Sequence, residues 1–118
     1  MPKTVLIVDD HPSFRRSARA ILEAEGFEVV GEAESGGSAI EAARRLHPDV
    51  VLLDIQLPDR SGFDVCSALL GLNGNRPEIV LVSSRDASDY GRLIAASGAS
   101  GFVPKADLSG DAVSTLLE

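Results

Sequence analysis

Cysteine is almost absent from this sequence, which contains a single one, Cys66. One cysteine cannot form a disulfide within the chain, and no Cys-x-x-Cys or paired cysteine and histidine spacing suggests a zinc site. We therefore expect Cys66 to be a small residue of the core or of a helix. Aromatic residues are also few, at 4%, whereas the 44% apolar content is ordinary for a globular core.

The sequence also lacks long apolar stretches and an excess of basic residues. No apolar run approaches the roughly 20 residues that a membrane-spanning helix needs, and the start, Met1-Pro2-Lys3, is not a signal peptide. We expect a soluble, cytoplasmic protein with no membrane partner. The 11 basic and 18 acidic residues give a net charge of −7, which opposes binding to nucleic acid by this domain alone. A length of 118 residues predicts one domain over residues 1–118.

Five short, mostly β-branched apolar runs are bounded by turn residues and predict the strands of a sheet. They lie at Val5–Val8, Val29–Val30, Val50–Leu53, Ile79–Val82 and Phe102–Val103. After each run, apolar residues recur at the spacing of a helix face. The helical sets are Phe14, Ala18, Ile21 and Leu22; Ala39, Ala43 and Leu46; Val65, Leu69 and Leu72; Leu93 and Ile94; and Ala112, Val113, Leu116 and Leu117.

Strict alternation of strand and helix predicts a parallel sheet, because parallel neighbours need a crossover and a helix usually supplies it. The strand runs are continuously apolar, which fits a sheet covered by helices on both faces. Right-handed crossovers leave few topologies, and five βα units fit a flavodoxin-like, doubly wound α/β fold with strand order 2-1-3-4-5. In that order, ligands bind at the carboxyl ends of the first and third strands.

Polar residues stand where the predicted strands end. Asp9 and Asp10 follow the first run, Asp54 the third and Ser83 the fourth, and Lys105 comes shortly after the fifth. Because parallel strands end at one edge of the sheet, we expect these five side chains to gather there. Asp54 is therefore expected in a crevice and not among apolar side chains, where an ionised carboxylate is costly.

Three clustered carboxylates repel one another and need a compensating cation. Lys105 supplies one positive charge, and a divalent metal would supply two. Mg²⁺ fits best, because it accepts one or two carboxylates together with waters and a phosphate oxygen. In such a site a carboxylate can act as a nucleophile toward a phosphoryl group, while the metal, the ammonium and a hydroxyl stabilise the charge that develops.

Taken together, these residues resemble the receiver domains of bacterial two-component response regulators, over essentially the whole chain. The resemblance implies that phosphate comes from the phosphohistidine of a sensor histidine kinase. It also identifies PDRSG, residues 58–62, as the family's Pro-x-x-x-Gly turn. The implied site residues are the phosphoacceptor Asp54; the metal ligands Asp10, Asp54, Asp9 (mainly through water) and Gln56 (through its backbone carbonyl); the phosphate-pairing Lys105; and the switch residues Ser83 and Phe102.

One feature of the sequence departs from the family pattern, and two residues are expected to affect the lifetime of the phosphoryl group. Proline usually follows the lysine, but here Pro104 precedes Lys105 and Ala106 follows it, so we expect no cis peptide after the lysine. Gln56 and Arg85 are expected to flank the route of water to the phosphoryl group and to set its lifetime.

Simpler interpretations exist for some of these residues. Asp9 and Asp10, just before His11 and Pro12, could instead cap the first helix, because carboxylates favour helix N-termini. Ser83 is chosen over the adjacent Ser84 by family spacing alone. His11 and His47 have no pairing suited to a metal and are expected in a loop and at a helix end.

Three other functions are compatible with parts of this sequence. Phosphohydrolases of the haloacid-dehalogenase type also use an aspartate nucleophile after an apolar strand, but they place a second aspartate where this sequence has Gln56. A receiver that binds partners without phosphate is a further alternative. Flavin or dinucleotide binding fits the fold, yet no G-x-G-x-x-G or G-x-x-x-x-G-K-[ST] motif occurs. We expect a regulator, and no enzyme activity beyond its own phosphorylation and hydrolysis.

The end of the sequence, DAVSTLLE, has a helical pattern up to its last residue. We therefore expect a receiver cut from a longer regulator, with a C-terminal output domain absent from this chain. EVVGEAESG, residues 28–36, and the lysine without its following proline resemble the branch that carries a LuxR-type helix-turn-helix. DNA would then be bound only through the missing domain. A homodimer that forms on phosphorylation would suit this function, because dimers of helix-turn-helix proteins bind two half-sites. The alternative is a stand-alone receiver that acts by binding other proteins.

Overall fold

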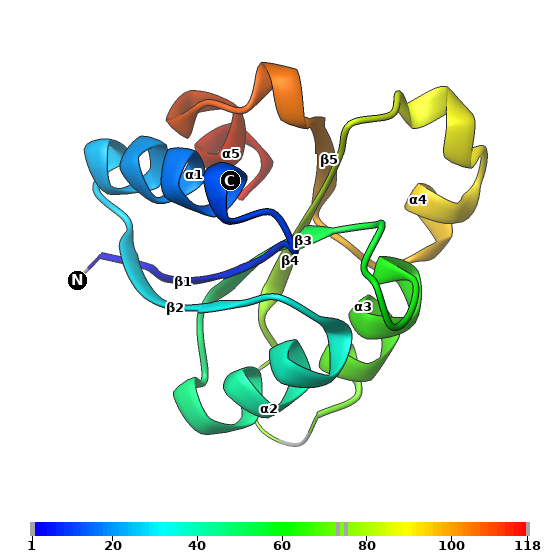
Figure 1. Ribbon diagram of the computed structural model, residues 1–118, viewed down its shortest axis with the longest axis horizontal. Helices are drawn as coiled ribbons and strands as arrows, with labels where there is room; N and C mark the ends of the chain where they lie inside the picture. Colours follow the sequence, from blue (N-terminus) through cyan, green and yellow to red (C-terminus); the bar gives the residue numbers. More distant parts are fainter. Residues whose placement is uncertain (1, 73, 75, 118) are drawn as a thin grey trace.

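A parallel sheet of five strands forms the centre of the molecule (Figure 1). The computed structural model describes residues 2–72, 74 and 76–117. The strand order is β2-β1-β3-β4-β5, so the flavodoxin-like fold predicted from the sequence is confirmed. The strands are β1 (Thr4–Val8), β2 (Glu28–Ala33), β3 (Val50–Asp54), β4 (Glu78–Ser83) and β5 (Gly101–Pro104).

Helices cover both faces of the sheet (Figure 1). Helices α1 and α5 pack on one face, and α2 and α3 pack on the other. Among the described residues, no helix has the length and the apolar character needed to cross a membrane. The helices are α1 (Pro12–Glu25), α2 (Gly36–Leu46), α3 (Gly62–Leu70), α4 (Leu93–Ala96) and α5 (Gly110–Leu116), with the 3₁₀ helices η1 (Ala87–Tyr90) and η2 (Lys105–Asp107).

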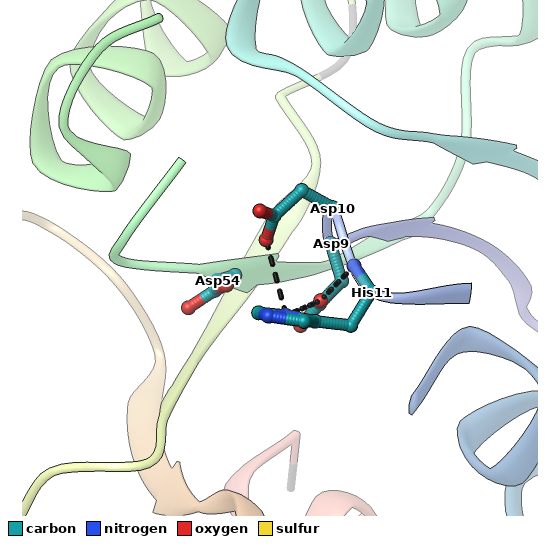
Figure 2. Close-up of side chains that lie close together, drawn as sticks. All are labelled: Asp9, Asp10, His11 and Asp54. Atoms are coloured by element: carbon teal, nitrogen blue, oxygen red, sulfur yellow. Dashed lines mark hydrogen bonds and ion pairs between the residues drawn. The ribbon is translucent and has the colours of Figure 1, made fainter. Parts of the chain in front are cut away.

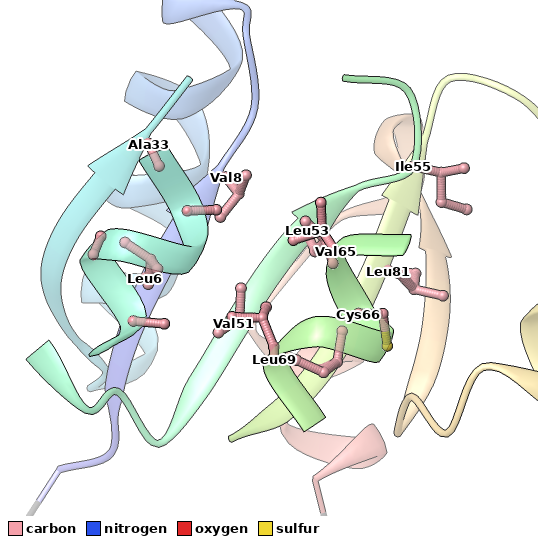
Figure 3. Close-up of a cluster of buried hydrophobic side chains, with 14 residues drawn as sticks. Leu6, Val8, Ala33, Val51, Leu53, Ile55, Val65, Cys66, Leu69 and Leu81 are labelled. Carbon is pink, nitrogen blue, oxygen red and sulfur yellow. The ribbon is translucent and has the colours of Figure 1, made fainter. Parts of the chain in front are cut away.

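The hydrophobic core has two halves, one on each side of the sheet. Successive strand residues point to opposite faces, so Leu6 and Val8 pack under α2 and α3 whereas Val5 and Ile7 pack under α1 and α5. Figure 3 shows the half that includes Leu6 and Val8. Cys66 lies buried in this half, on α3, as the sequence predicts. Because both faces are covered, polar groups of the inner strands meet solvent only at the strand ends.

The predicted helices differ from the observed ones mainly at their ends. Leu72, assigned to the face of the third helix, lies beyond α3, which ends at Leu70 and is capped by Gly71. The fifth helix ends at Leu116, and Leu117 is its C-cap. The expectation of helix up to the last residue is therefore wrong for Leu117. Residue 118 lies outside the described residues.

The segment between β4 and β5 is the least regular part of the fold. In place of one helix it holds η1 and the single turn of α4, separated by Gly91 at φ +56°. Neither short helix contains a buried residue, because the apolar period that anchors longer helices is missing there.

Gly62 closes the turn between β3 and α3 because no side chain fits there. Its N–H donates to the carbonyl of Ile55 over 2.7 Å. A Cβ atom at this position would lie 2.6 Å from Cα of Ile55 and would also press on the carbonyl oxygen of Asp54. The backbone that carries Asp54 is thus packed directly against the first residue of α3.

Gly62→Ala is expected to lower the free energy of unfolding by about 1–3 kcal/mol, because the added methyl group overpacks rigid backbone. Gly37→Ala is the matched control, since a Cβ at Gly37 meets only Oδ2 of Asp59 at 3.6 Å. Urea denaturation of both variants gives the comparison. Equal stability of the two would contradict the packing role of Gly62.

Candidate functional site

Three carboxylates gather at the carboxyl edge of the sheet, as predicted. Asp9 and Asp10 follow β1, and Asp54 is the last residue of the neighbouring β3, in a register that pairs Val8 with Leu53. Asp9 and Asp54 are buried, at 0% and 2% exposure, and Asp10 is partly buried. Figure 2 shows the three side chains around one point.

Lys105 reaches the same point from η2. Its Nζ lies 2.6 Å from Oδ2 of Asp9 and 3.3 Å from Oδ2 of Asp54. The ammonium also stands 4.6 Å from the ring centre of Phe14 on α1, a cation–π distance. One cation therefore faces two buried carboxylates and is held in place by the first helix.

His11 also belongs to this cluster, which corrects the sequence interpretation that it has no pairing suited to a metal. Its Nδ1 lies 3.0 Å from Oδ1 of Asp9 and 3.1 Å from Oδ1 of Asp10. Ligand atoms from His11 and the three aspartates all lie within 4.8 Å of one another (Figure 2). The chain turns at this N-cap residue of α1, and the turn brings the imidazole back over the carboxylates.

The carboxylates of Asp9 and Asp10 do not cap α1. His11 is the N-cap residue, with no side-chain cap bond to the helix, and the helix begins at Pro12. Oδ1 of Asp9 instead accepts the backbone N–H of His11, before the helix starts. The capping alternative is therefore wrong.

Two oxygens of the cluster fit a metal ion. Oδ2 of Asp9 and Oδ1 of Asp10 are buried, with the ammonium of Lys105 at 2.6 Å from the first and the imidazole of His11 at 3.1 Å from the second. One ammonium does not balance three clustered carboxylates, and coordination to a metal ion would lower the cost of their burial. The three carboxylates of the cluster supply the oxygen ligands that Mg²⁺ prefers, and Asp10 is only partly buried. The residues present therefore fit the magnesium ion that the sequence implies.

The charge cluster shifts the pKa values of its members. Burial raises the pKa of the Asp54 carboxyl from 3.8 to about 6, and the charge of Asp9 acts in the same direction. The N–H of Gln56 and the ammonium of Lys105 oppose this rise. Burial also lowers the pKa of Lys105, but its hydrogen bond to Asp9 and the charge of Asp54 outweigh burial, so that this pKa is raised. Lys105 therefore stays positive beside the carboxylates.

The other predicted site residues lie in the loop after β3, at the end of β4 and on β5. The backbone N–H of Gln56 donates to Oδ1 of Asp54 over 3.1 Å, and the Gln56 side chain is exposed. Ser83 ends β4 and is fully buried, whereas Ser84 is exposed. Phe102 on β5 is half-buried against the core. No cis peptide occurs in the described chain, including the bond after Lys105.

The model of one protein family matches nearly the whole chain. The response regulator receiver domain aligns with residues 5–113, a stretch that includes the four clustered charges and all five strands except Thr4, the first residue of β1. The chain belongs to the response regulator receiver domains.

Two curated relatives place this receiver among the regulators of two-component systems. It is 43% identical over 105 residues to the nitrate/nitrite response regulator protein NarP of Escherichia coli, an alignment that covers 88% of this chain and 48% of NarP. It is 42% identical over 101 residues to the transcriptional regulatory protein KdpE of Mycobacterium tuberculosis, covering 86% of this chain and 43% of KdpE. The receiver thus spans about half the length of the curated relatives it matches.

A solved structure supports the same branch that the sequence suggested. The receiver superimposes with a TM-score of 0.85 and 28% identity on a two-component response regulator of the LuxR family from Aurantimonas sp. SI85-9A1. The match covers 99% of this chain and 86% of that one.

Sequence reasoning missed three residues that contact the predicted site residues. His11 is the N-cap of the first helix and Phe14 lies in its first turn, and their roles depend on how the chain turns after Asp10. The hydroxyl of Tyr90 lies 2.6 Å from Oγ of Ser83. The sequence signal for Tyr90 was available, since it is the only tyrosine, but no motif ties it to the serine.

The raised pKa of Asp54 predicts a pH-dependent stability in Mg²⁺-free buffer. Because the folded pKa lies above the unfolded value, the folded receiver binds more protons between about pH 4 and pH 6, and this contribution is lost as the pH rises through about 6. Asp54→Asn lacks this titration. It is expected to be more stable than wild type by about 1–3 kcal/mol near pH 7, and by less near pH 4. Urea denaturation at both pH values measures the difference in the free energy of unfolding between Asp54→Asn and wild type. A difference that does not increase from pH 4 to pH 7 contradicts the prediction.

Proposed function

We propose that this receiver accepts a phosphoryl group on Asp54 from the phosphohistidine of a sensor histidine kinase. The observation that carries the proposal is the burial of Asp54 beside Asp9, with the ammonium of Lys105 within 3.3 Å of both. An oxygen of Asp54 attacks phosphorus, the phosphorus–nitrogen bond breaks, and the imidazole nitrogen takes the electron pair and then a proton. The product is an acyl phosphate.

Mg²⁺ is the proposed cofactor. Asp9, Asp10 and Asp54 would hold it, with the backbone carbonyl of Gln56 as a further ligand. When bound, the ion neutralises carboxylate charge and stabilises the charge that develops on the phosphoryl oxygens. This support matters because a phosphoryl group adds about −1.5 to −2 charges to a site that is already acidic.

Each remaining site residue has a proposed task. Lys105 pairs with a phosphoryl oxygen, since it already faces the carboxylate that would carry the group. Ser83 donates its hydroxyl to another phosphoryl oxygen, and Phe102 moves as the serine does. The position two residues after Asp54 holds the exposed Gln56 and no acid, so we propose no turnover of small phosphate esters. The chemistry is confined to the receiver's own phosphorylation and hydrolysis.

We propose that the output is control of transcription. NarP and KdpE are, by name, a response regulator and a transcriptional regulatory protein, and each is about twice as long as its match to this chain. We propose that an additional DNA-binding domain of the LuxR type binds the DNA, because the net charge of −7 on the receiver opposes DNA binding by the receiver itself. The regulator would act in the cytoplasm as a dimer that forms on phosphorylation. A stand-alone receiver that binds other proteins is the alternative.

Acetyl phosphate tests the phosphoacceptor proposal without a kinase. The receiver is incubated with acetyl phosphate and Mg²⁺, or with acetyl phosphate and EDTA, and its intact mass is measured. We expect one phosphoryl adduct with Mg²⁺ and none with EDTA. An unmodified mass in both samples would overturn the proposal and favour a receiver that binds partners without phosphate.

A further inference from the structure

The side chain of Ser83 points to the opposite face of the sheet from the side chain of Asp54. In the parallel register Asp54 pairs with Val82, whose side chain packs under α1 and α5. Because successive residues of a strand point to opposite faces, the side chain of Ser83, next along β4, points toward the α3 and α4 side. The hydroxyl must therefore turn before it can meet a phosphoryl group on Asp54.

The hydroxyl of Tyr90 holds Ser83 on that side. The two oxygens lie 2.6 Å apart, a short hydrogen bond, and Oγ of Ser83 also accepts the backbone N–H of Arg85 over 3.0 Å. Ser83 itself is fully buried. The serine hydroxyl either donates to Tyr90 or accepts from it, and in both cases its oxygen lies on the α3 and α4 side, so it must leave this contact to donate to a phosphoryl oxygen on Asp54.

The ring of Tyr90 is held by two other aromatic rings. Phe63 on α3 and Phe102 on β5 approach it edge to face, with ring centres 5.7 Å and 6.1 Å away. The chain around Tyr90 is otherwise exposed from Ser84 to Asp89, and Gly91 follows it with a positive φ. Tyr90 is therefore the anchor of an exposed segment, and its hydroxyl contacts the side chain that phosphorylation would draw away.

We infer that Tyr90 is a positioning residue that restrains Ser83 in the unphosphorylated receiver and is released when Asp54 is phosphorylated. The inference rests on the proposed function of Asp54. It adds a third residue to the switch that the family resemblance implies, and places that residue on the segment before α4. Ile55, Leu57 and Leu93 line an apolar hollow together with Phe63 and Tyr90, and Leu93 is 56% exposed. Release of Tyr90 therefore reshapes a surface as well as freeing a hydroxyl.

Tyr90→Phe tests the restraint because it removes one oxygen and keeps the ring contacts. A neutral hydrogen bond contributes about 0.5–1.5 kcal/mol, so the variant is expected to gain the phosphoryl adduct from acetyl phosphate and Mg²⁺ about two- to tenfold faster than wild type. Ser83→Ala provides the matched background. In that background Tyr90→Phe is expected to change the rate by less than about twofold, because the group it restrains is gone.

Tyrosine fluorescence gives an independent readout. The chain contains one tyrosine and no tryptophan, so its tyrosine emission reports on Tyr90 alone. Beryllium fluoride with Mg²⁺, used as a phosphoryl mimic, is expected to change the emission of the wild type and to leave that of Asp54→Asn unchanged.

The outcomes separate the inference from the function on which it rests. If the wild type gains the adduct but Tyr90→Phe reacts at the same rate and the emission does not respond, the restraint is refuted and the phosphoacceptor stands. An equal acceleration with and without the Ser83 hydroxyl also refutes it, since the effect would then bypass the serine. If the wild type gains no adduct, both proposals fall. Thermal melting of each variant confirms that the rates compare folded proteins.

Discussion

Asp54→Asn is expected to abolish the phosphoryl adduct entirely. The amide has no ionised oxygen to attack phosphorus, although its size is close to that of the carboxylate and its oxygen can still accept the N–H of Gln56. The fold is therefore expected to survive. Intact mass after incubation with acetyl phosphate and Mg²⁺ measures the loss, and circular dichroism checks the fold.

Asp64→Asn is the matched control for this result. Asp64 is an exposed carboxylate in the first turn of α3, away from the strand ends. The variant carries the same chemical change and is expected to gain the adduct as the wild type does. Labelling that persists in Asp54→Asn, or vanishes in both variants, would contradict the assignment of Asp54 as the acceptor.

Asp10→Ala is expected to weaken Mg²⁺ binding and phosphorylation together. Oδ1 of Asp10 lies 3.1 Å from Nδ1 of His11 and, among the described residues, accepts no hydrogen bond, so removing the side chain breaks no hydrogen bond of that oxygen there. Loss of a carboxylate ligand is expected to lower Mg²⁺ affinity by at least about tenfold, the lower end of the cost of losing even an outer-shell partner. Calorimetric titration with Mg²⁺ gives the affinity, and the adduct rate is measured at limiting and at high Mg²⁺.

High Mg²⁺ distinguishes a ligand from a structural residue. If Asp10 is a ligand, a large excess of the ion is expected to restore part of the adduct rate in Asp10→Ala. His11→Gln is the useful comparison, because it removes the imidazole beside Asp10 and leaves all three carboxylates. Wild-type Mg²⁺ affinity in Asp10→Ala would remove Asp10 from the metal site.

The sheet and the position of the acidic cluster were predictable because strong, local signals point to both. Val50–Leu53 is continuously apolar, a pattern typical of a strand covered by helices on both faces, and Asp54 follows it directly. Parallel strands end at one edge, so a fold with the order 2-1-3-4-5 brings Asp9 and Asp54 together whatever the side-chain detail.

The details that sequence reasoning missed depend on contacts between segments. The sequence shows no pairing of His11 suited to a metal, but its partners are the two carboxylates just before it, at the turn into α1. The hydrogen bond of Tyr90 to Ser83 depends on the irregular segment around Gly91, where apolar periodicity is too weak to fix a conformation. Such contacts follow from tertiary packing, which periodicity does not encode.

Chemical trapping of the phosphorylated residue tests the central claim most directly. Hydroxylamine cleaves an acyl phosphate and leaves a hydroxamate on the acyl carbon, whereas phosphate esters of serine and tyrosine resist it. The receiver is treated with acetyl phosphate and Mg²⁺ and then with hydroxylamine, and its peptides are mapped by mass spectrometry. We expect a hydroxamate at Asp54 only when both acetyl phosphate and Mg²⁺ were present. A phosphoryl group that survives hydroxylamine, or a hydroxamate at another carboxylate, would contradict the account.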